Sequence, residues 1–438
     1  MATVYGGTNG RCKASIAHSL RWPGTSGNRV TQHSHGNDRM RFDPARLDRI
    51  PAFIKERYLD NGKLPHAQVL IAHRGEVVHF SSQGPAREDA AAAIDEGTIF
   101  RIASMTKPVT SVAFMQLLEQ ARVSLDTPVH HVLPEFKGLS VYNGGGAGVP
   151  FQTRACVRPM QMVDLLRHTS GLTYGFQNRT NIDAAYREGK IENWHGNLTL
   201  DEFIAALGQL PLEFSPGEAW NYSVSTDVLG AVVERVSGQR LDEYFRQHIF
   251  APLKMDDTGF MVPESQTHRL PDCYSFVPGK GRVLFDRGAE SLWARQPKLL
   301  SGGGGLVSTA LDYHRFNTML LNGGALDGAR ILGRKSIELM TLNHLPDDGD
   351  LASWSKSLFS EATNAGVGFG LGFAVNLDPV RTMIPGSVAE FYWGGMYSTA
   401  FFVDPVEEIT MVFMTQLAPS STYPIRRELK TLIYSALV

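Results

Sequence analysis

Segments with strand character lie near both ends of this chain, and helix-forming patterns fill the stretch between them. Near the N-terminus, the apolar runs Ala67–Ala72 and Val77–Phe80 flank a glycine-containing turn at 73–76, which indicates an antiparallel hairpin. Further strand-like segments follow near the C-terminus: Gly366–Leu377, Phe391–Trp393, Ser398–Val403 and Ile409–Met414. We therefore expect one antiparallel sheet that is assembled from both ends of the chain.

The middle of the chain, residues 122–299, predicts an inserted and mainly helical domain. Apolar residues recur there at helical spacing in Met160–Arg167, Leu200–Leu207, Ser225–Val236 and Leu241–Ile249. The flanking parts, 43–121 and 300–438, are expected to form the sheet domain. Its helices should run from Asp43 to Gly62, over Pro108–Glu119 and over Tyr423–Leu437. The expected fold class is thus α+β or α/β, with helices that flank the sheet.

The composition is that of an ordinary globular protein. Of the 438 residues, 43% are hydrophobic and 20% are charged, which excludes a disordered or collagen-like chain. Lys and Arg number 42 and Asp and Glu number 44, a balance that argues against nucleic-acid or anionic-membrane partners. No apolar run approaches the roughly 20 residues of a membrane span. We expect a soluble protein; its oligomeric state stays open.

The cysteines and the first 42 residues bear on localisation. Cys12, Cys156 and Cys273 are too few and too widely spaced for a disulfide framework, so we expect a reducing compartment and a cytoplasmic protein. Residues 1–42 are rich in Arg, and their only acidic residue is Asp38. No apolar segment of a secretory signal follows. We interpret this stretch as a disordered or extraneous extension, with an organelle transit peptide as the alternative.

A serine and a lysine stand at the start of the expected buried helix with a spacing suited to nucleophilic catalysis. Ser104 and Lys107 are at i and i+3, which puts both side chains on one face of a helical turn. A serine hydroxyl needs a nearby base to accept its proton, and a desolvated lysine is such a base. A second S-x-x-K copy, Ser353 and Lys356, precedes no apolar helix. We interpret that copy as a chance occurrence in a solvated loop.

Two other segments contain residues suited to a site. A Pro-Gly turn ahead of Tyr222 predicts a tyrosine in a loop and outside the core, with a half-buried, locally bonded tyrosine as the alternative. Gly394 and Gly395, after Trp393, permit close backbone approach by a ligand, with a β-bulge as the alternative. The glycine-rich turn 301–305 lacks the Lys-Ser/Thr of a P-loop, which argues against phosphate binding.

Five motifs in this order resemble those of one superfamily. They are Phe100–Ser111 (FRIASMTKPVTS), Leu165–Gly175 (LLRHTSGLTYG), Pro216–Ser225 (PGEAWNYSVS), Gly302–Phe316 (GGGGLVSTALDYHRF) and Tyr392–Pro405 (YWGGMYSTAFFVDP). Together they resemble the serine β-lactamase-like superfamily, specifically the family VIII carboxylesterases related to class C β-lactamases and DD-peptidases. The resemblance covers about Asp43 to Leu437. It implies an active site at the interface between the sheet domain and the helical domain.

The resemblance assigns roles to individual residues. It implies that Ser104 is the acylated nucleophile, Lys107 its partner and Tyr222 the tyrosine of the Y-x-N/Y-S-x motif. Either Lys107 or Tyr222 would take the proton from Ser104. Because both side chains are ordinarily protonated at neutral pH, the surroundings must lower the pKa of the one that acts as the base. The resemblance further implies an oxyanion hole made by the backbone N–H groups of Ser104 and Met396. It implies neither a cofactor nor a metal.

The chain departs from the β-lactamase pattern at two places that contact substrate in that family. Trp393-Gly394-Gly395 stands where β-lactamases have K-[ST]-G, and Val224 stands where Y-x-N has its Asn. A cation for a substrate carboxylate and an amide partner for a side chain are therefore lost, and Trp393 offers an apolar wall instead. We expect a serine carboxylesterase for short- to medium-chain esters, with weak β-lactam hydrolysis left open. The alternatives are a β-lactamase or D-Ala/D-amino peptidase, a non-enzymatic member of the superfamily, and an acyltransferase.

Other hydrolase classes lack their signatures here. No Ser has Gly at both ±2, as the α/β-hydrolase nucleophile elbow requires. The histidine pairs 130–131 and 33/35 lack the spacing of metal ligands, and we expect them to be exposed to solvent. His168, within the Leu165–Gly175 motif, is expected to stabilise a loop rather than to catalyse.

Overall fold

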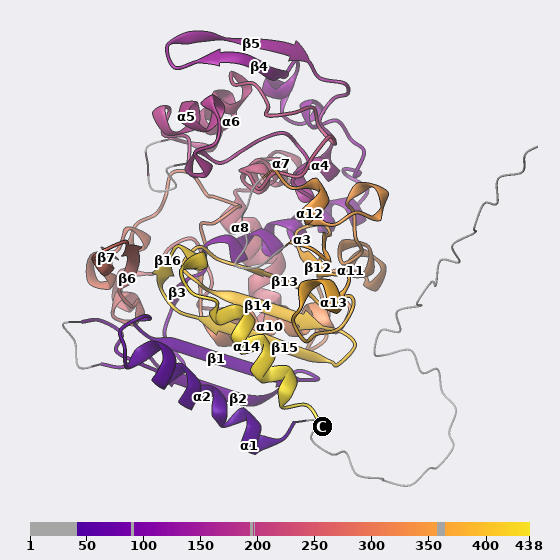
Figure 1. The fold of residues 1–438 in the computed structure, drawn as a ribbon. Helices are drawn as coiled ribbons and strands as arrows, with labels where there is room; N and C mark the ends of the chain where they lie inside the picture. Colours follow the sequence, from indigo (N-terminus) through magenta and orange to yellow (C-terminus); the bar gives the residue numbers. More distant parts are fainter. Residues whose placement is uncertain (1–41, 89–91, 193–195, 197, 357–363) are drawn as a thin grey trace, which may run out of the picture.

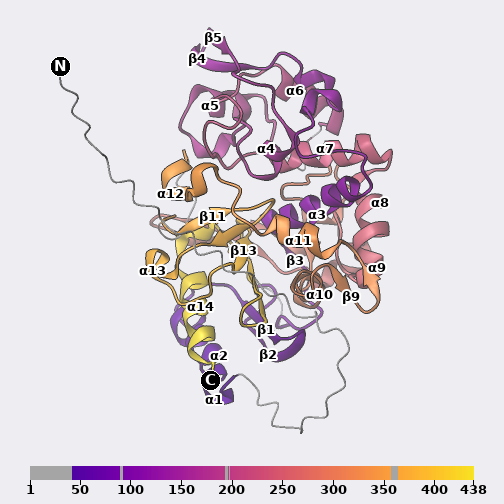
Figure 2. The same cartoon turned by 90° about the vertical axis from the view of Figure 1, so that its right-hand side faces the viewer.

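The computed structural model describes residues 42–88, 92–192, 196, 198–356 and 364–438. Two lobes make up this part of the chain (Figures 1 and 2). The lower lobe in Figure 1 contains the sheet, and the upper lobe contains mainly helices with one hairpin at its outer end. None of the helices in the described ranges is long and apolar enough to cross a membrane.

The lower lobe is built on a seven-stranded sheet with the order β11-β12-β13-β14-β15-β1-β2. Its strands are β1 (Ala67–His73), β2 (Glu76–Gln83), β11 (Val367–Phe369), β12 (Ala374–Asn376), β13 (Phe391–Gly394), β14 (Ala400–Asp404) and β15 (Ile409–Met414). All neighbouring strands are antiparallel. Strand β1 pairs with β15, with Ile71 opposite Met411, so the sheet joins the two ends of the chain as the sequence predicts.

Alternate residues of the strands face two different layers of helices, because successive side chains of a strand point to opposite faces. On one face, Val69, Phe402 and Phe413 pack with the terminal helices. These are α1 (Pro44–Leu47), α2 (Arg49–Ile54) with the π-turn Lys55–Leu59, and α14 (Ile425–Ser435). On the other face, Leu70 and Val412 pack with α3 (Thr106–Glu119) and α10 (Ala310–Leu321).

The first described residue already belongs to the fold. Phe42 is buried and forms a β-bridge with Leu437, and the Asp43 side chain accepts a hydrogen bond from the Ala45 N–H at 2.9 Å to cap α1. The predicted helix start at Asp43 is therefore confirmed, and Phe42 falls on the folded side of the expected boundary. The rest of the predicted extension, 1–41, lies outside the described residues.

Helix α3 packs against α7 (Ser225–Ser237), and α7 also contacts α4 (Met162–Leu166). The other helices of the middle segment are α5 (Asn181–Glu188), α6 (Leu200–Gly208), α8 (Leu241–Phe245) with the π-turn Arg246–Phe250, and α9 (Ala251–Leu253). Residues Thr106 to Met115 of α3 are all buried, as the mixed apolar pattern of that helix predicts. This buried helix carries the residues of the candidate site at its N-terminal end.

Two hairpins in the middle segment were not predicted from the sequence. One consists of β4 (Ser140–Gly146) and β5 (Val149–Ala155), and the other of β6 (Cys273–Val277) and β7 (Gly281–Asp286). Strand β5 is exposed along most of its length, so it lacks the alternation of apolar residues that marks a half-buried strand. Strand β6 also pairs with β16 (Leu417–Ala418) from the C-terminal region. The expected domain boundaries remain a prediction.

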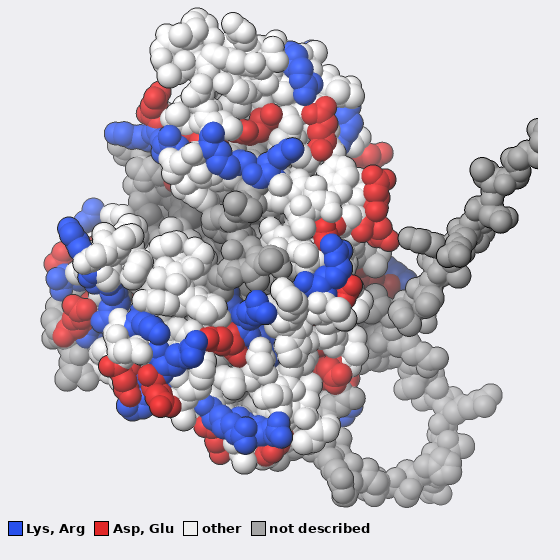
Figure 3. All heavy atoms as spheres, in the orientation of Figure 1, with Lys and Arg blue, Asp and Glu red and all other residues white. Residues whose placement is uncertain are grey.

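The remaining short β-strands and α-helices connect these layers. They are β3 (Phe100–Arg101), β8 (Val307–Ser308), β9 (Ala325–Leu326), β10 (Ala329–Arg330), α11 (Arg334–Met340), α12 (Leu351–Trp354) and α13 (Pro379–Thr382). On the face drawn in Figure 3, acidic and basic side chains are interspersed over both lobes. This distribution agrees with the nearly balanced charge of the sequence.

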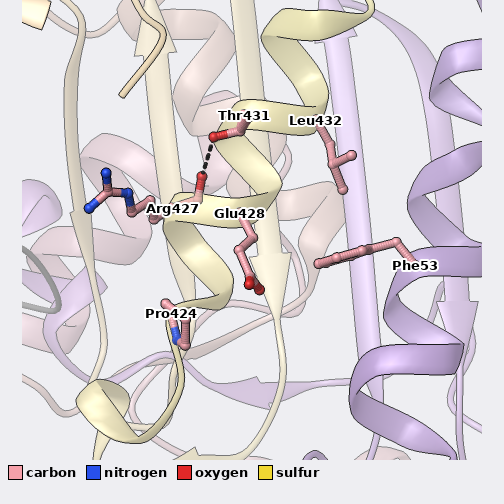
Figure 4. A pocket seen from close by; sticks show the side chains of 6 residues that line it. All are labelled: Phe53, Pro424, Arg427, Glu428, Thr431 and Leu432. Carbon is pink, nitrogen blue, oxygen red and sulfur yellow. Dashed lines mark hydrogen bonds between the residues drawn. The ribbon is translucent and has the colours of Figure 1, made fainter. Parts of the chain in front are cut away.

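A surface pocket of about 360 Å³ lies between α2 and α14 (Figure 4). It is lined by Phe53, Pro424, Arg427, Glu428, Thr431 and Leu432. The Thr431 hydroxyl is engaged within α14, where it donates to the Arg427 carbonyl at 3.0 Å. None of the predicted site residues lines this pocket, so it is separate from the candidate site.

Candidate active site

Ser104 lies in a short 3-10 turn, Ala103–Met105, between β3 and α3. Ala103 has a φ of 45°, a left-handed conformation that is costly for a residue with a β-carbon. The Thr106 hydroxyl holds this turn, because it donates to the Ala103 carbonyl at 2.7 Å and accepts from the Leu306 N–H at 3.1 Å. Ser104 is partly exposed, whereas Ala103 is fully buried. The turn therefore presents Ser104 at the surface of a rigid core.

Lys107 lies one turn further along α3 and is only 1% exposed. Its Nζ is 3.4 Å from Ser104 Oγ, 3.0 Å from the Tyr174 hydroxyl and 2.8 Å from the Gly303 carbonyl oxygen. Three oxygen atoms thus surround the side-chain nitrogen of Lys107. The structure brings together Ser104 and Lys107, the pair predicted from the i, i+3 spacing.

Tyr222 lies in a loop before α7, but its side chain is 1% exposed and forms part of the core. The expectation that it lies outside the core is therefore wrong. Its loop is held against the upper lobe by backbone hydrogen bonds from Asn221 to His168 and from Val224 to Thr173. The Lys107 Nζ lies 4.5 Å from the centroid of the Tyr222 ring. Tyr222 thus covers the amine with its ring face.

Tyr174 is the site residue that the sequence analysis missed. It stands in the Leu165–Gly175 motif, where no role was assigned to it, and its hydroxyl is 3.0 Å from the Lys107 Nζ. Burial raises the pKa of Tyr174 well above its ordinary value, and the nearby Asp227 and Tyr222 act in the same direction. Tyr174 is therefore a neutral phenol that orients the lysine. The tyrosine in the motif was the available signal in the sequence. Only the fold of the upper lobe shows that its hydroxyl faces Lys107.

Asp227 is a buried carboxylate on α7 that fixes the glycine-rich turn. It accepts hydrogen bonds from the Ser301 hydroxyl and from the Gly303 N–H, the latter at 3.1 Å. The carbonyl of the same Gly303 accepts from Lys107. Burial raises the pKa of Asp227, whereas the charge of Lys107 and the Ser301 hydrogen bond oppose that shift. The glycine-rich turn thus presents a carbonyl to the lysine.

Strand β13 passes beside the Ser104 turn. The Thr399 hydroxyl donates to the Ile102 carbonyl at 3.3 Å, and Gly395 lies against the same carbonyl. Trp393 is partly buried on β13, and its indole N–H donates to the Tyr222 hydroxyl at 3.4 Å. Met396 follows β13 and is partly exposed. The structure thus places the Trp393-Gly394-Gly395-Met396 segment next to the nucleophile turn.

Two residues of the motifs lie in the core rather than at an open surface. Val224 caps α7 and is 1% exposed. His168 is equally buried, and its Nδ1 is 3.2 Å from the Ser223 hydroxyl. Burial lowers the pKa of His168 well below its ordinary value, and the charge of Lys107 adds to this. A neutral His168 packed against Trp220 and Tyr222 has the loop-stabilising place that we expected of it.

The second S-x-x-K copy differs from the first in burial. Ser353 and Lys356 are exposed, on and just beyond α12. The segment is nevertheless bound to the loop that leads to Tyr222, because the Lys356 N–H donates to the Trp220 carbonyl at 2.9 Å.

Of the predicted exposed histidines, His130 is partly buried and His131 exposed, while the 33/35 pair lies outside the described residues. In the part of the chain that the structure describes, no group of three or more His, Cys, Asp or Glu residues could hold a metal ion.

Comparison with known proteins identifies the family. The family model described as β-lactamase matches residues 54–434. The chain belongs to the β-lactamase family. Protein Rv1367c of Mycobacterium tuberculosis (strain ATCC 25618 / H37Rv) is 34% identical over 85% of this chain and 90% of its own length. Esterase EstB of Burkholderia gladioli is 29% identical over 89% of this chain and 95% of its own length.

A solved structure supports the same placement. EstCE1, a hydrolase with promiscuous acyltransferase activity, is 25% identical and has a TM-score of 0.74. The match covers 89% of this chain and 99% of that one. The resemblance to the family VIII carboxylesterases and the expected fold class are thereby confirmed. The chain is a hydrolase of the serine β-lactamase-like superfamily.

Proposed function

We propose that the protein is a serine carboxylesterase that hydrolyses short- to medium-chain esters through an acyl-enzyme on Ser104. The observation that carries the proposal is the pairing of Ser104 Oγ with the buried Lys107 Nζ at 3.4 Å. Esterase EstB and the hydrolase EstCE1 match this chain over most of its length and support the same reaction class. No cofactor takes part in the proposed reaction.

The proposed reaction has two stages. In the first, Ser104 Oγ attacks the ester carbonyl carbon while Lys107 or Tyr222 accepts the hydroxyl proton, and the tetrahedral oxyanion forms between the Ser104 and Met396 N–H groups. Collapse of this intermediate breaks the bond to the alkoxy oxygen, which leaves with that proton as the alcohol. In the second stage, water attacks the acyl carbon and its proton passes to the same base. The bond to Ser104 Oγ then breaks, Oγ takes up that proton, and the carboxylic acid leaves.

The residues around the site favour an uncharged substrate. Trp393 places an indole where β-lactamases have a lysine for the substrate carboxylate. Val224, where those enzymes have an asparagine, is buried and has no side-chain amide. A β-lactam would therefore lose a charge-assisted hydrogen bond, worth about 1.5–3 kcal/mol. Transition-state arithmetic converts this into a roughly tenfold to hundredfold loss in rate.

A substrate panel tests the proposed specificity. We expect kcat/KM for p-nitrophenyl acetate or butyrate to exceed the values for nitrocefin and a penicillin, and to fall for the octanoate and palmitate esters. A lactam value equal to or above that of the best ester would favour a β-lactamase, and D-Ala-D-Ala and D-amino amide substrates test for the peptidases. Added alcohol acceptors test for acyl transfer, the second activity in the description of EstCE1.

Trp393→Lys should narrow the difference in kcat/KM between esters and lactams, because it restores a cation where the carboxylate of a β-lactam would bind. Trp393→Phe is the matched control, since it keeps an aromatic wall but removes the N–H that donates to the Tyr222 hydroxyl. An unchanged ratio of ester to lactam kcat/KM in Trp393→Lys would show that Trp393 does not set the preference for esters.

The two tyrosines should differ in their effect on turnover. Tyr222→Phe is expected to lower kcat about 10²-fold or more, the lower range of general acid–base catalysis. Tyr174→Phe should lower it only about tenfold, because a neutral phenol contributes one hydrogen bond to Lys107, worth about 1.5 kcal/mol. Steady-state kinetics with p-nitrophenyl butyrate measure both variants. A larger loss in Tyr174→Phe than in Tyr222→Phe would reverse the roles given to the two residues.

A further inference from the structure

The peptide between Gly395 and Met396 is held by its carbonyl group. The Gly395 carbonyl oxygen accepts a hydrogen bond from Arg426 Nη2 at 2.6 Å and another from the Ser398 N–H at 3.1 Å. The same Arg426 nitrogen donates to the Thr399 carbonyl at 2.8 Å, so the guanidinium joins α14 to both ends of the turn after β13. The carbonyl group of this peptide is thus held by residues that are not among the proposed catalytic residues.

The fixed carbonyl determines where the N–H of the same peptide points. A trans peptide is planar, and its C=O and N–H point in opposite directions. The Gly395–Met396 peptide is trans, so the Met396 N–H points away from the Arg426 guanidinium. Within the described residues, this N–H donates to no protein acceptor. It is therefore available to a bound oxyanion.

The two glycines of this segment serve contacts within the protein. A β-carbon on Gly394 would lie 2.6–2.8 Å from the guanidinium atoms of Arg426, so only glycine lets the arginine approach the strand. A β-carbon on Gly395 would lie 2.4 Å from the carbonyl oxygen of Ile102, two residues before Ser104. The glycines thus bring the peptide close to Arg426 and to the nucleophile turn at the same time.

We propose that Arg426 is a positioning residue of the oxyanion hole: it holds the Gly395–Met396 peptide so that the Met396 N–H faces the reacting carbonyl oxygen. A cation bonded to the carbonyl also polarises the peptide and makes its N–H a stronger donor. The assignment rests on the proposed acyl-enzyme mechanism. It adds to it a residue on the C-terminal helix that does not touch the substrate.

Arg426→Met tests the assignment, with Arg427→Met as the matched control. Arg427 is the next residue on α14, and its guanidinium donates to the Met383 carbonyl instead. We expect Arg426→Met to lower kcat about 10- to 100-fold, less than the 10²- to 10³-fold loss of a whole oxyanion donor. KM should stay within about threefold, since transition-state contacts act on kcat. Arg427→Met should keep the wild-type kcat.

Two further variants separate positioning from general destabilisation. Arg426→Lys keeps a cationic donor and should recover part of the lost kcat. Gly394→Ala keeps Arg426 but displaces its guanidinium, and it should reproduce the low kcat of Arg426→Met. Thermal unfolding of all variants is followed in parallel. A wild-type kcat in a folded Arg426→Met protein, or a kcat loss shared by Arg427→Met, would overturn the assignment.

The rate of fluorophosphonate labelling at Ser104 separates this assignment from the proposed ester specificity. The tetrahedral phosphonate places a polar oxygen in the oxyanion hole whether or not any ester is turned over. Arg426→Met should slow this labelling about tenfold, which corresponds to about 1.4 kcal/mol of transition-state stabilisation. Arg427→Met should leave the labelling rate unchanged. Equal labelling rates in the two variants would reject the role of Arg426, even if esters are hydrolysed. If Arg426→Met slows labelling but the wild-type protein hydrolyses no ester, the role of Arg426 stands and only the proposed ester specificity is rejected.

Discussion

Replacing Lys107 by alanine is expected to lower kcat for p-nitrophenyl butyrate by a factor of about 10² to 10⁴, the range of general acid–base catalysis. Lys107 is 1% exposed, and its Nζ contacts Ser104 Oγ, the Tyr174 hydroxyl and the Gly303 carbonyl. Its removal takes away the amine beside the nucleophile and against the face of the Tyr222 ring. Because either Lys107 or Tyr222 accepts the proton, the loss in the double variant should be smaller than the product of the two single losses.

The second S-x-x-K copy supplies the control for this experiment. Lys356→Ala removes an exposed side chain of the same type, while its backbone contacts with Trp220 remain. This variant should keep the wild-type kcat. Activity within about threefold of wild type in Lys107→Ala, with a native circular dichroism spectrum, would contradict the catalytic assignment of the lysine. Independent, multiplicative losses for Lys107 and Tyr222 would contradict a shared proton path.

Replacing Arg101 by methionine is expected to lower the free energy of unfolding by about 3–5 kcal/mol, the cost of breaking a buried ion pair. Arg101 is fully buried three residues before Ser104. Its guanidinium pairs with Asp286 and also donates to the Ser291 hydroxyl at 3.0 Å and the Pro271 carbonyl at 2.8 Å. The variant leaves the Asp286 carboxylate, 8% exposed, without its cation.

Urea unfolding monitored by tryptophan fluorescence measures this change. The double variant Arg101→Met with Asp286→Leu is the control, because replacing both members of a buried pair by apolar residues is often neutral. We expect it to recover most of the lost stability. Arg101→Met within about 1 kcal/mol of wild type would show that the pair does not stabilise the segment before the nucleophile.

The sheet could be predicted from the sequence because its strands carry local signals. The β1–β2 hairpin has a glycine-containing turn between two apolar runs, and the C-terminal strands are short, apolar and separated by turns. The β4–β5 hairpin gave no such signal, since β5 is exposed and does not alternate. In the β6–β7 hairpin, β6 also pairs with β16, about 140 residues further along the chain. Contacts of that kind follow from the three-dimensional fold.

The candidate site shows the same division. Ser104 and Lys107 could be predicted because i, i+3 spacing on one helix fixes their proximity. The contact of Tyr174 with Lys107 joins two lobes, and the sequence could not show which tyrosine faces the amine. Gly394 was expected to admit a ligand, whereas the structure puts Arg426 there. Sequence alone indicates that the backbone is approached closely, but the approaching group is known only from the fold.

Covalent labelling of Ser104 tests the central claim most directly. The protein is treated with a fluorophosphonate, digested, and analysed by peptide mass spectrometry, in parallel with Ser104→Ala and Ser353→Ala. We expect the adduct on the peptide that contains Ser104, loss of labelling and of esterase activity in Ser104→Ala, and unchanged behaviour in Ser353→Ala. An adduct on Ser353, or full activity in Ser104→Ala, would contradict an acyl-enzyme mechanism at Ser104.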